Sequence, residues 1–327
     1  MTYPLPEPRS IPGVTWRPAI KDDAAAIVVL QDACFEADGG FREVESEILE
    51  RWESDYCNVT DDSLIAVKDD GRIIATSWSY IPTIAATKWR AFADNFVHPE
   101  WRTSEIQEFV HAWWEARCLQ RLAVFDDGLD QWLWRGVYDW QTDAIDFLVE
   151  HGYEPMRYYD ELIRDLSKPI DARPFDPALR VETWESAPLE DSLTAHNGSF
   201  IDHWGSQPIA ETSWAQGVNE FTLMDASFVV YDGSEPVAYL MAAAFPHDFK
   251  DKGRTEAWVE GLGTIRSHRK RGIASALVTR AMEVFEAAGM EYAALGVDSE
   301  NPTGAFHIYE SLGFVSDRRN IAYIKKV

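Results

Sequence analysis

Residues 269–274, Arg-Lys-Arg-Gly-Ile-Ala, have the composition of a turn that binds an anion through its backbone. Gly272 has no side chain and Ala274 has only a methyl group, so an anion can come within hydrogen-bonding distance of the peptide N–H groups. The basic residues of the turn, together with Arg266, add local positive charge. These residues predict a site for a phosphate-bearing ligand, and the alternative is a solvated basic turn at the surface.

The turn must lie between a strand and a helix if it is to bind a phosphate in this way. Residues 257–264 (AWVEGLGT) have the composition of a short strand, and residues 273–288 carry apolar side chains at helical spacing before Gly289. In this order the first turn of the helix presents unpaired N–H groups and the positive end of its dipole to the ligand. The Walker pattern and the three-glycine dinucleotide fingerprint are both absent from the sequence, which argues against a P-loop NTPase and an NAD enzyme.

The residues that follow extend the pattern. A strand is predicted over residues 292–297, and a helix over residues 304–312 that ends at Gly313. The segments VEGLGTIRSHRKRGIASAL and VDSENPTGAFHIYESLGF resemble the GNAT superfamily of acyl-CoA-dependent N-acyltransferases, most specifically over residues 255–315. The resemblance implies that the turn holds the pyrophosphate of coenzyme A and that the preceding strand bonds the pantetheine arm through its backbone. The cofactor-binding residues that it implies are Leu262, Gly263, Thr264, Arg269, Lys270, Arg271, Gly272, Ile273, Ala274 and Asn301.

Transfer of an acetyl group from a thioester to an amine requires a neutral amine, donors for the oxyanion, and a proton for the departing thiolate. The resemblance implies that Tyr309 is the general acid, although a tyrosine on an amphipathic helix can also be a packing residue. Glu260, on the strand beside the turn, is the candidate base, with a solvated strand carboxylate as the alternative. A backbone N–H at Leu262 or Gly263 would meet the oxyanion. We expect no metal and no covalent enzyme intermediate.

Residues 199–207 (SFIDHWGSQ) lie where the GNAT fold places a loop that covers the acceptor. In this segment Asp202 could hold a cationic amine, and His203 or Trp204 could line its pocket. A structural hydrogen-bonding role is the alternative for the histidine.

Length and composition place the chain among two-domain proteins without a membrane segment. It has 327 residues, of which 46% are hydrophobic, and no apolar run approaches the ~18 residues that a membrane span needs. The start of the chain lacks the features of a signal peptide, so we expect a cytoplasmic protein. Cys34, Cys57 and Cys118 cannot form a closed set of disulfides and have no CxxC spacing. We expect them to be buried apolar residues.

The net charge of −25 argues against a nucleic-acid partner. The basic segment RSHRKR is too short to form an electrostatic footprint for nucleic acid. A cationic acceptor, either a small molecule or a peptide amine, suits this charge better. The sequence leaves a monomer and a homodimer both open.

The same plan occurs twice in the chain. Arg102 lies 167 residues before Arg269, and hairpins are predicted over residues 63–80 and 227–244. We therefore predict the α/β class, with two tandem GNAT folds that are each a twisted, mixed, mostly antiparallel sheet flanked by helices. The predicted domains are a Pro-rich tail over residues 1–12, a degenerate GNAT domain over 13–166, a Pro-rich linker over 167–180 and an active domain over 181–327.

The first copy has different residues at the positions that would do chemistry. Alignment of the two arginines places Glu105 opposite Gly272, where a carboxylate would block the backbone approach and repel a pyrophosphate. The same comparison, with a count back from the terminal glycines, gives three further differences: Gln107 for Ala274, Leu148 for Tyr309 and Trp140 for Asn301.

The sequence thus predicts an N-acetyltransferase that moves an acetyl group from acetyl-CoA to a primary amine by direct attack in a ternary complex. The alternative is a non-catalytic acyl-CoA sensor or scaffold, which the presence of Asn301 and Tyr309 disfavours. A nucleic-acid-associated role through the basic segment is disfavoured by the overall charge.

Overall fold

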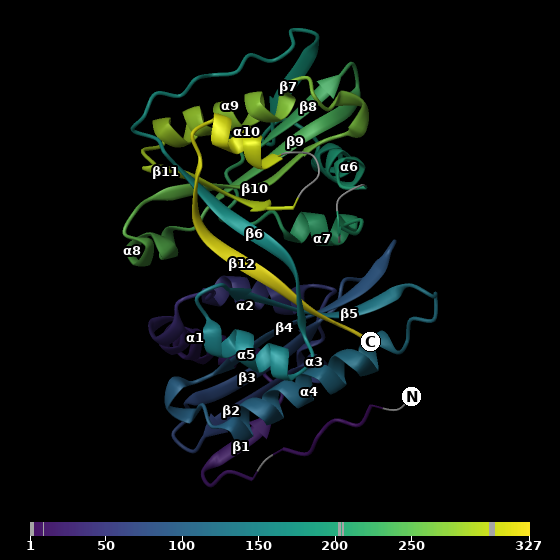
Figure 1. Ribbon diagram of the computed structural model, residues 1–327, viewed down its shortest axis with the longest axis vertical. Coiled ribbons are helices and arrows are strands. Elements are labelled where there is room, and N and C mark those ends of the chain that lie inside the picture. Colours follow the sequence, from purple (N-terminus) through teal and green to yellow (C-terminus); the bar gives the residue numbers. More distant parts are fainter. Residues whose placement is uncertain (1–2, 9, 202–203, 205, 301–304) are drawn as a thin grey trace. The chain divides into compact units, whose positions relative to one another are not determined.

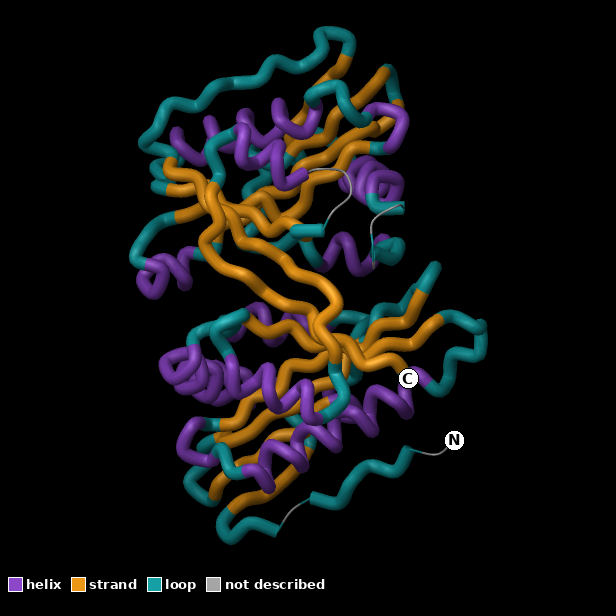
Figure 2. The backbone as a smooth tube through the Cα atoms, in the orientation of Figure 1, coloured by secondary structure: helices purple, strands orange, loops and turns teal. Residues whose placement is uncertain are grey.

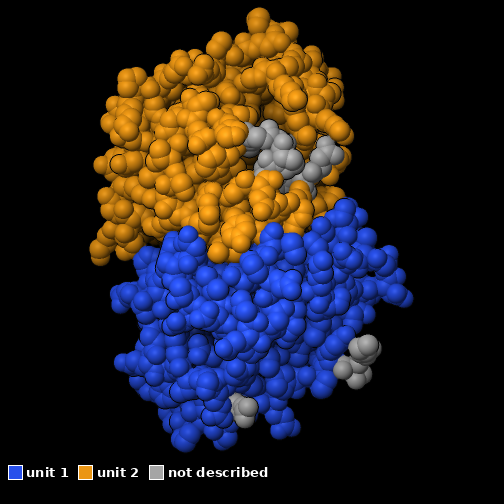
Figure 3. Space-filling view, viewed as in Figure 1, with its two compact units in different colours: residues 1–156, 322–327 blue, residues 157–321 orange. Residues whose placement is uncertain are grey.

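The computed structural model describes residues 3–8, 10–201, 204, 206–300 and 305–327 (Figure 1). It consists of sheets flanked by helices, which confirms the predicted α/β class (Figure 2). The chain divides into two compact units (Figure 3). Unit 1 comprises Met1–Met156 and Ala322–Val327, and unit 2 comprises Arg157–Ile321. Strands β6 (Glu154–Asp165) and β12 (Val315–Lys326) therefore each contribute residues to both units.

Unit 1 is a sheet in the order β1-β2-β3-β4-β5, followed by the end of β12. Neighbouring strands are antiparallel from β1 to β4, whereas β4 and β5 are parallel. One face packs on α1 and α2, and the other packs on α4. The strands are β1 (Val14–Arg17), β2 (Ser63–Lys68), β3 (Ile73–Tyr80), β4 (Lys88–Val97) and β5 (Asp130–Tyr138). The helices are η1 (Lys21–Asp23), α1 (Ala24–Asp38), α2 (Glu45–Glu53), α3 (Val59–Asp62), η2 (Pro99–Trp101), α4 (Ser104–Leu122) and α5 (Thr142–Glu150).

Unit 2 repeats this plan in the order β7-β8-β9-β10-β11-β6. Its largest core packs α9 and α10 on one face of the sheet, and a smaller aromatic core packs α6 and α7 on the other. The strands are β7 (Leu179–Thr183), β8 (Phe228–Asp232), β9 (Glu235–Ala244), β10 (Glu256–Thr264) and β11 (Tyr292–Asp298). The helices are α6 (Leu189–Ser199), α7 (Glu211–Gln216), η3 (Pro246–Asp248), α8 (Phe249–Lys252), η4 (Arg266–His268), α9 (Ile273–Ala287) and α10 (Ala305–Ser311).

The elements that position the predicted site form where the sequence predicts them. Helix α9 buries Ile273, Leu277 and Phe285, which recur at helical spacing, on one face of the sheet. Both predicted hairpins are present, as β2–β3 and β8–β9. Residues 169–176, within the predicted linker, form neither helix nor strand. Asn301 lies outside the described residues.

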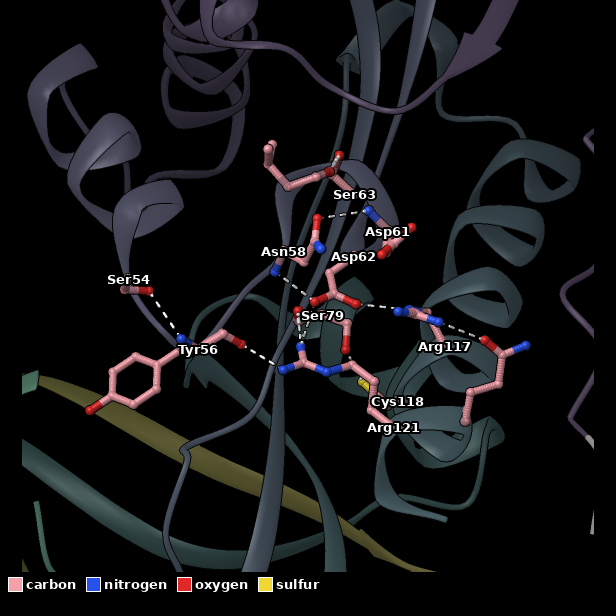
Figure 4. A network of polar contacts seen from close by, with 12 residues as sticks. Ser54, Tyr56, Asn58, Asp61, Asp62, Ser63, Ser79, Arg117, Cys118 and Arg121 are labelled. Carbon is pink, nitrogen blue, oxygen red and sulfur yellow. Dashed lines mark hydrogen bonds and ion pairs between the residues drawn. The ribbon is translucent and has the colours of Figure 1, made fainter. Parts of the chain in front are cut away.

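A buried polar network helps to hold α4 in unit 1 (Figure 4). The carboxylate of Asp62, which is 2% exposed, accepts hydrogen bonds from Arg117 Nε at 2.8 Å and from the Asn58 backbone N–H at 2.8 Å. Arg121 Nη1 lies 3.1 Å from the same carboxylate, and its Nη2 donates to the Tyr56 carbonyl at 2.7 Å. This network links α4 to the segment before β2, and it neutralises a carboxylate that would be costly to bury alone.

The three cysteines are buried and free, as expected. No helix in the described part of the chain is both long enough and apolar enough to cross a membrane.

Candidate active site

Strands β10 and β11 of unit 2 separate halfway along their length. They are parallel and paired from Glu256 and Tyr292 up to Val259 and Leu295, although both strands continue beyond that point. Within the described residues, the backbone of β10 after Val259 therefore has no strand partner on the side of β11. Unpaired N–H and C=O groups of this kind can bind an extended ligand as an added strand.

A β-bulge lies where the two strands separate. The pairing of β10 with β9 shifts register between Val259 and Gly261, so Glu260 is the extra residue. Val259 and Leu262 pack against the core on the α9 side. Because a bulge places two successive residues opposite one partner, Glu260 and Gly261 both face the α6 side. The Glu260 side chain is exposed there, at the edge left by the separated strands.

Two glycines of β10 make room for an aromatic ring. A Cβ atom at Gly261 would lie 2.8 Å from the Tyr239 hydroxyl, and one at Gly263 would lie 2.6 Å from the Ser199 Cβ and 2.8 Å from the Tyr239 ring. These contacts are too close for any side chain at either position. The glycines allow Tyr239 to lie flat against the strand that sequence analysis associates with the ligand.

Buried Tyr239 and half-buried His196 form a pair that the sequence did not reveal. Their hydroxyl and Nδ1 atoms are 2.7 Å apart, and Trp214 packs edge-on against the tyrosine ring. Burial lowers the pKa of His196 to about 4, so its ring is uncharged at neutral pH. Its Nδ1 can then accept a hydrogen bond from the Tyr239 hydroxyl. Burial also raises the pKa of Tyr239. The two residues lie 43 positions apart, and no local pattern marks them.

The turn before α9 has the backbone conformation of an anion-binding loop. Lys270 and Gly272 both have positive φ angles, of 63° and 78°. No side chain of the described residues caps the helix at Gly272, and a Cβ atom added there would meet nothing within 4 Å. The N–H groups of the first helical turn thus have no side-chain cap among the described residues, and the helix dipole there favours an anion.

Two arginines of the turn bond to protein groups. Arg269 Nε donates to the Thr264 carbonyl at 3.1 Å, and its Nη2 donates to the Ser199 carbonyl at 2.7 Å. It thereby ties the end of β10 to the end of α6. Arg271 Nη2 donates to Asp176 at 2.7 Å. An anion at this turn would depend mainly on backbone groups, with the arginines shaping the loop.

Tyr309 lies in α10 with its side chain in the large core, where its ring packs edge-on against Phe314. Burial raises the pKa of Tyr309 to about 12, so the hydroxyl stays protonated at neutral pH and can donate a proton. The charge of an ionised Tyr309 would raise the pKa of Tyr239, so the two hydroxyls are within electrostatic range of each other.

The remaining residues of the predicted site are placed only in part. Asp202 and His203 of the expected acceptor loop lie outside the described residues, like Asn301. Trp204 is described, and the Arg157 guanidinium lies 4.4 Å from the centre of its ring. Within the described ranges, no three His, Cys, Asp or Glu side chains are arranged to hold a metal ion.

The corresponding region of unit 1 is occupied by side chains. Strands β4 and β5 also stop pairing before their ends, at Phe92 and Trp134. Trp114 of α4 is fully buried, and its indole N–H donates to the Phe92 carbonyl at 3.1 Å, at the point where the strands separate. Strand β4 pairs with β3 from Phe92 to Val97 without a register shift, so the bulge of β10 has no counterpart.

The predicted alignment of Glu105 with Gly272, and with it that of Gln107 with Ala274, is wrong because the two turns differ in length. Helix α4 begins at Ser104, two residues after Arg102, whereas α9 begins four residues after Arg269. Glu105 therefore lies within the first helical turn. The residue that precedes the helix is Thr103, and its hydroxyl accepts a hydrogen bond from the Ile106 N–H at 3.3 Å. Unit 1 thus caps its helix with its own side chain.

Leu148, by contrast, occupies the same place in unit 1 as Tyr309 does in unit 2. The Tyr153 N–H donates to the Leu148 carbonyl at 3.0 Å, and the Phe314 N–H donates to the Tyr309 carbonyl at 3.1 Å. The two helices therefore end in the same hydrogen-bonded turn, but the leucine has no proton to donate. Trp140 is the residue that the count back from the terminal glycines places opposite Asn301. It is 42% exposed, and its indole N–H donates to the Asp38 carbonyl at 3.1 Å.

Comparison with known proteins links this geometry to one family. Residues 189–314 match the model of the acetyltransferase (GNAT) family. No curated protein matches the chain significantly.

Solved structures share the fold over nearly the whole chain. A GCN5-related N-acetyltransferase from Sphaerobacter thermophilus is 22% identical with a TM-score of 0.69, and the match covers 99% of this chain and 97% of that one. A tandem GNAT protein from the clavulanic acid biosynthesis pathway is 15% identical with a TM-score of 0.66, over 96% and 98% of the two chains. Saccharomyces cerevisiae N-myristoyltransferase is 11% identical with a TM-score of 0.67, over 97% and 79%. The predicted tandem GNAT fold is thereby confirmed.

Proposed function

Because residues 189–314 form a domain of the acetyltransferase (GNAT) family, we propose that unit 2 transfers an acetyl group from acetyl-CoA to a primary amine of a small molecule or peptide. The observation that carries this proposal is the separation of β10 from β11 directly beside an uncapped helix start. The ligand would bind through an extended arm followed by a pyrophosphate. The free edge of β10 suits the arm and the helix start suits the pyrophosphate, and the two features lie in that order.

In this proposal the pantetheine arm bonds the backbone of Leu262, Gly263 and Thr264, and the pyrophosphate binds residues 269–274. Support comes from the missing strand partner on one side and from the open space around Gly272 on the other. Asn301 remains part of the proposed site by its position in the family motif.

The proposed chemistry is a direct attack in which the acceptor nitrogen loses two protons and the departing sulfur gains one. Glu260, directly or through a water molecule, takes the proton of the acceptor ammonium, and the neutral amine then attacks the thioester carbonyl carbon. A backbone N–H at Leu262 or Gly263 stabilises the oxyanion that forms. When the carbon–sulfur bond breaks, the Tyr309 hydroxyl gives its proton to the thiolate, and the second proton that the nitrogen loses as the amide forms restores the Tyr309 hydroxyl. The high pKa of Tyr309 supports this role because the proton is still present at neutral pH.

We further propose that unit 1 binds no coenzyme. Trp114 lies where its strands separate, and the Thr103 hydroxyl accepts a hydrogen bond from the Ile106 N–H in the first turn of its helix. Both positions that an acyl-CoA would need are therefore filled by the chain itself.

Titration calorimetry with acetyl-CoA tests the proposal, followed by release of free thiol in the presence of single amines. We expect one acetyl-CoA per chain and thiol release with at least one amine of a panel of aminoglycosides, polyamines, amino acids and peptides. Absence of binding would overturn the proposal. Binding without thiol release for any amine would favour a sensor or scaffold, and two molecules per chain would contradict an empty unit 1.

A further inference from the structure

A buried carboxylate at the open end of β11 has one oxygen without a hydrogen-bond partner. Asp298 is 5% exposed, and its Oδ1 accepts a hydrogen bond from the Glu300 N–H at 3.0 Å. Its Oδ2 is buried and bonds to none of the described residues. A buried acceptor in this state costs on the order of 1–3 kcal/mol, so native proteins rarely keep one unless a ligand or water uses it.

The position of Asp298 connects this oxygen to the proposed active site. Ala293, Leu295 and Val297 of β11 belong to the core on the α9 side, so Asp298 and Gly296 face the opposite side of the sheet. That is also the side of Glu260. Gly296 is exposed, and a Cβ atom added there would meet nothing within 4 Å. The surface between the two carboxylates is thus a bare stretch of backbone that leaves room for a ligand.

Strand geometry sets the spacing of the two carboxylates. Val259 and Leu295 are the last paired residues, so Glu260 lies level with Gly296 and Asp298 lies two residues further along. Two residues of strand and at least one strand spacing, because the strands separate here, place the two α-carbons at least on the order of 8 Å apart. A single ammonium group cannot bridge that distance, whereas an acceptor with two amines can.

We propose that Asp298 binds a second cationic group of the acceptor, which is therefore an amine with at least two positive charges, such as a polyamine. The inference rests on the proposed function, because it assigns the first amine to Glu260. The Asp298 oxygen and the ammonium then form a buried, charge-assisted hydrogen bond. The net charge of −25 favours the approach of such a cation.

Two neighbouring groups are consistent with this assignment. The hydrogen bond between Asp298 and Glu300 closes a turn at the end of β11, but it uses only one carboxylate oxygen. Arg157, a cation on β6, forms an ion pair with Glu300 and stacks on Trp204. Its Nε is buried and bonds to none of the described residues, so Arg157 does not satisfy the Asp298 oxygen either.

Calorimetry with spermidine on the full chain, with and without coenzyme A, tests the inference on wild type and Asp298→Asn. The asparagine keeps an oxygen for the Glu300 N–H and removes the charge. We expect wild type to bind spermidine and the substitution to weaken binding about thirtyfold or more. Butylamine, which has one charge, should bind weakly and equally to both proteins.

Asp165→Asn is the matched control, because Asp165 Oδ1 accepts the Ser167 N–H at 3.0 Å in the same kind of turn at the end of β6. It should bind spermidine like wild type. Wild type that fails to bind spermidine, or Asp298→Asn that binds it as well as wild type, would overturn the inference. Failure of coenzyme A to bind would instead count against the proposed function, and the titration without coenzyme still reports on Asp298.

Discussion

Both units have the motif arginine, Arg102 in unit 1 and Arg269 in unit 2, but the turns that follow it differ. In unit 1, Arg102 Nε donates to the carbonyl of Val97 at 2.9 Å, and its Nη1 donates to Asp38 at the end of α1. In unit 2, Arg269 bonds in the same way to the end of β10 and to the end of α6. The motif arginine thus joins a strand to a helix in both units. Its presence indicates the fold, and the conformation of the turn that follows it determines whether an anion can bind.

The units differ in how the space beside the fourth strand is used. In unit 2 the strand carries a bulge at Glu260 and two glycines, and the strand edge is open. In unit 1 Asp94 of β4 lies 2.8 Å from Arg51, which also forms an ion pair with the buried Glu43 at 2.5 Å. In the proposal that unit 1 binds no coenzyme, these ion pairs and Trp114 take the place that the open strand edge has in unit 2.

The largest effect should come from Glu43→Ala in unit 1. The substitution leaves the buried Arg51 with Asp94 as its remaining carboxylate, so the free energy of unfolding should fall by about 3–5 kcal/mol in urea denaturation. Acetyl-CoA binding should stay at one per chain. Glu53→Ala removes an exposed ion pair with Lys21 and should leave the unfolding midpoint unchanged. A small loss of stability would mean that the ion pairs do not hold unit 1 together.

Gly272→Glu in unit 2 should raise the Kd for acetyl-CoA about a hundredfold, because it puts a negative side chain beside the proposed pyrophosphate site. Calorimetry measures the change. Gly289→Glu is the control at the other end of α9, where φ is 81° and a Cβ atom also meets nothing within 4 Å. Equal losses from both substitutions would show that backbone strain, and not the anion site, explains the result.

Tyr309→Phe should lower kcat about thirtyfold with little change in the KM for acetyl-CoA, because it removes the proton donor and keeps the ring. In wild type the pKa of about 12 means that ionisation of Tyr309 should not reduce the rate below pH ~10. Tyr231→Phe removes a hydroxyl bonded to Asp191 and should leave kcat unchanged. A kcat that survives the loss of the Tyr309 hydroxyl would assign the proton to another group.

Lysine in place of Arg269 should have the smallest effect. It should lower stability by about 1–2 kcal/mol, as should Arg102→Lys in unit 1, because each loses the hydrogen bonds of a guanidinium. The Kd for acetyl-CoA should change less than about fivefold in Arg269→Lys. A loss as large as that of Gly272→Glu would show that the guanidinium itself binds the pyrophosphate.

Local patterns in the sequence were sufficient to predict the elements around the turn. Apolar spacing identified α9, and the hairpins followed from Asp-Gly turns between apolar runs. The role of Gly272 followed from the composition of the turn, and that of Tyr309 came from the family resemblance.

Features that depend on pairing between distant segments were beyond local patterns. The bulge at Glu260 arises from its register with β9, and the contact between Tyr239 and His196 requires the fold to bring them together. The alignment of Glu105 with Gly272 was wrong because it allowed no gap, whereas the turns of the two units differ in length. Asp298 is one of 55 acidic residues, and the sequence does not show which of them is buried. That its Oδ2 bonds to none of the described residues is visible only in the fold.

The division of β12 between the units has a consequence for biosynthesis. Residues Ala322–Val327 belong to unit 1, where the N–H of Val327 donates to the carbonyl of Gln131 at 3.0 Å. A ribosome delivers these residues after all of unit 2. The sheet of the first unit can therefore be completed only after unit 2 has been translated, and a fragment that stops at residue 166 would expose the edge of β5 to aggregation.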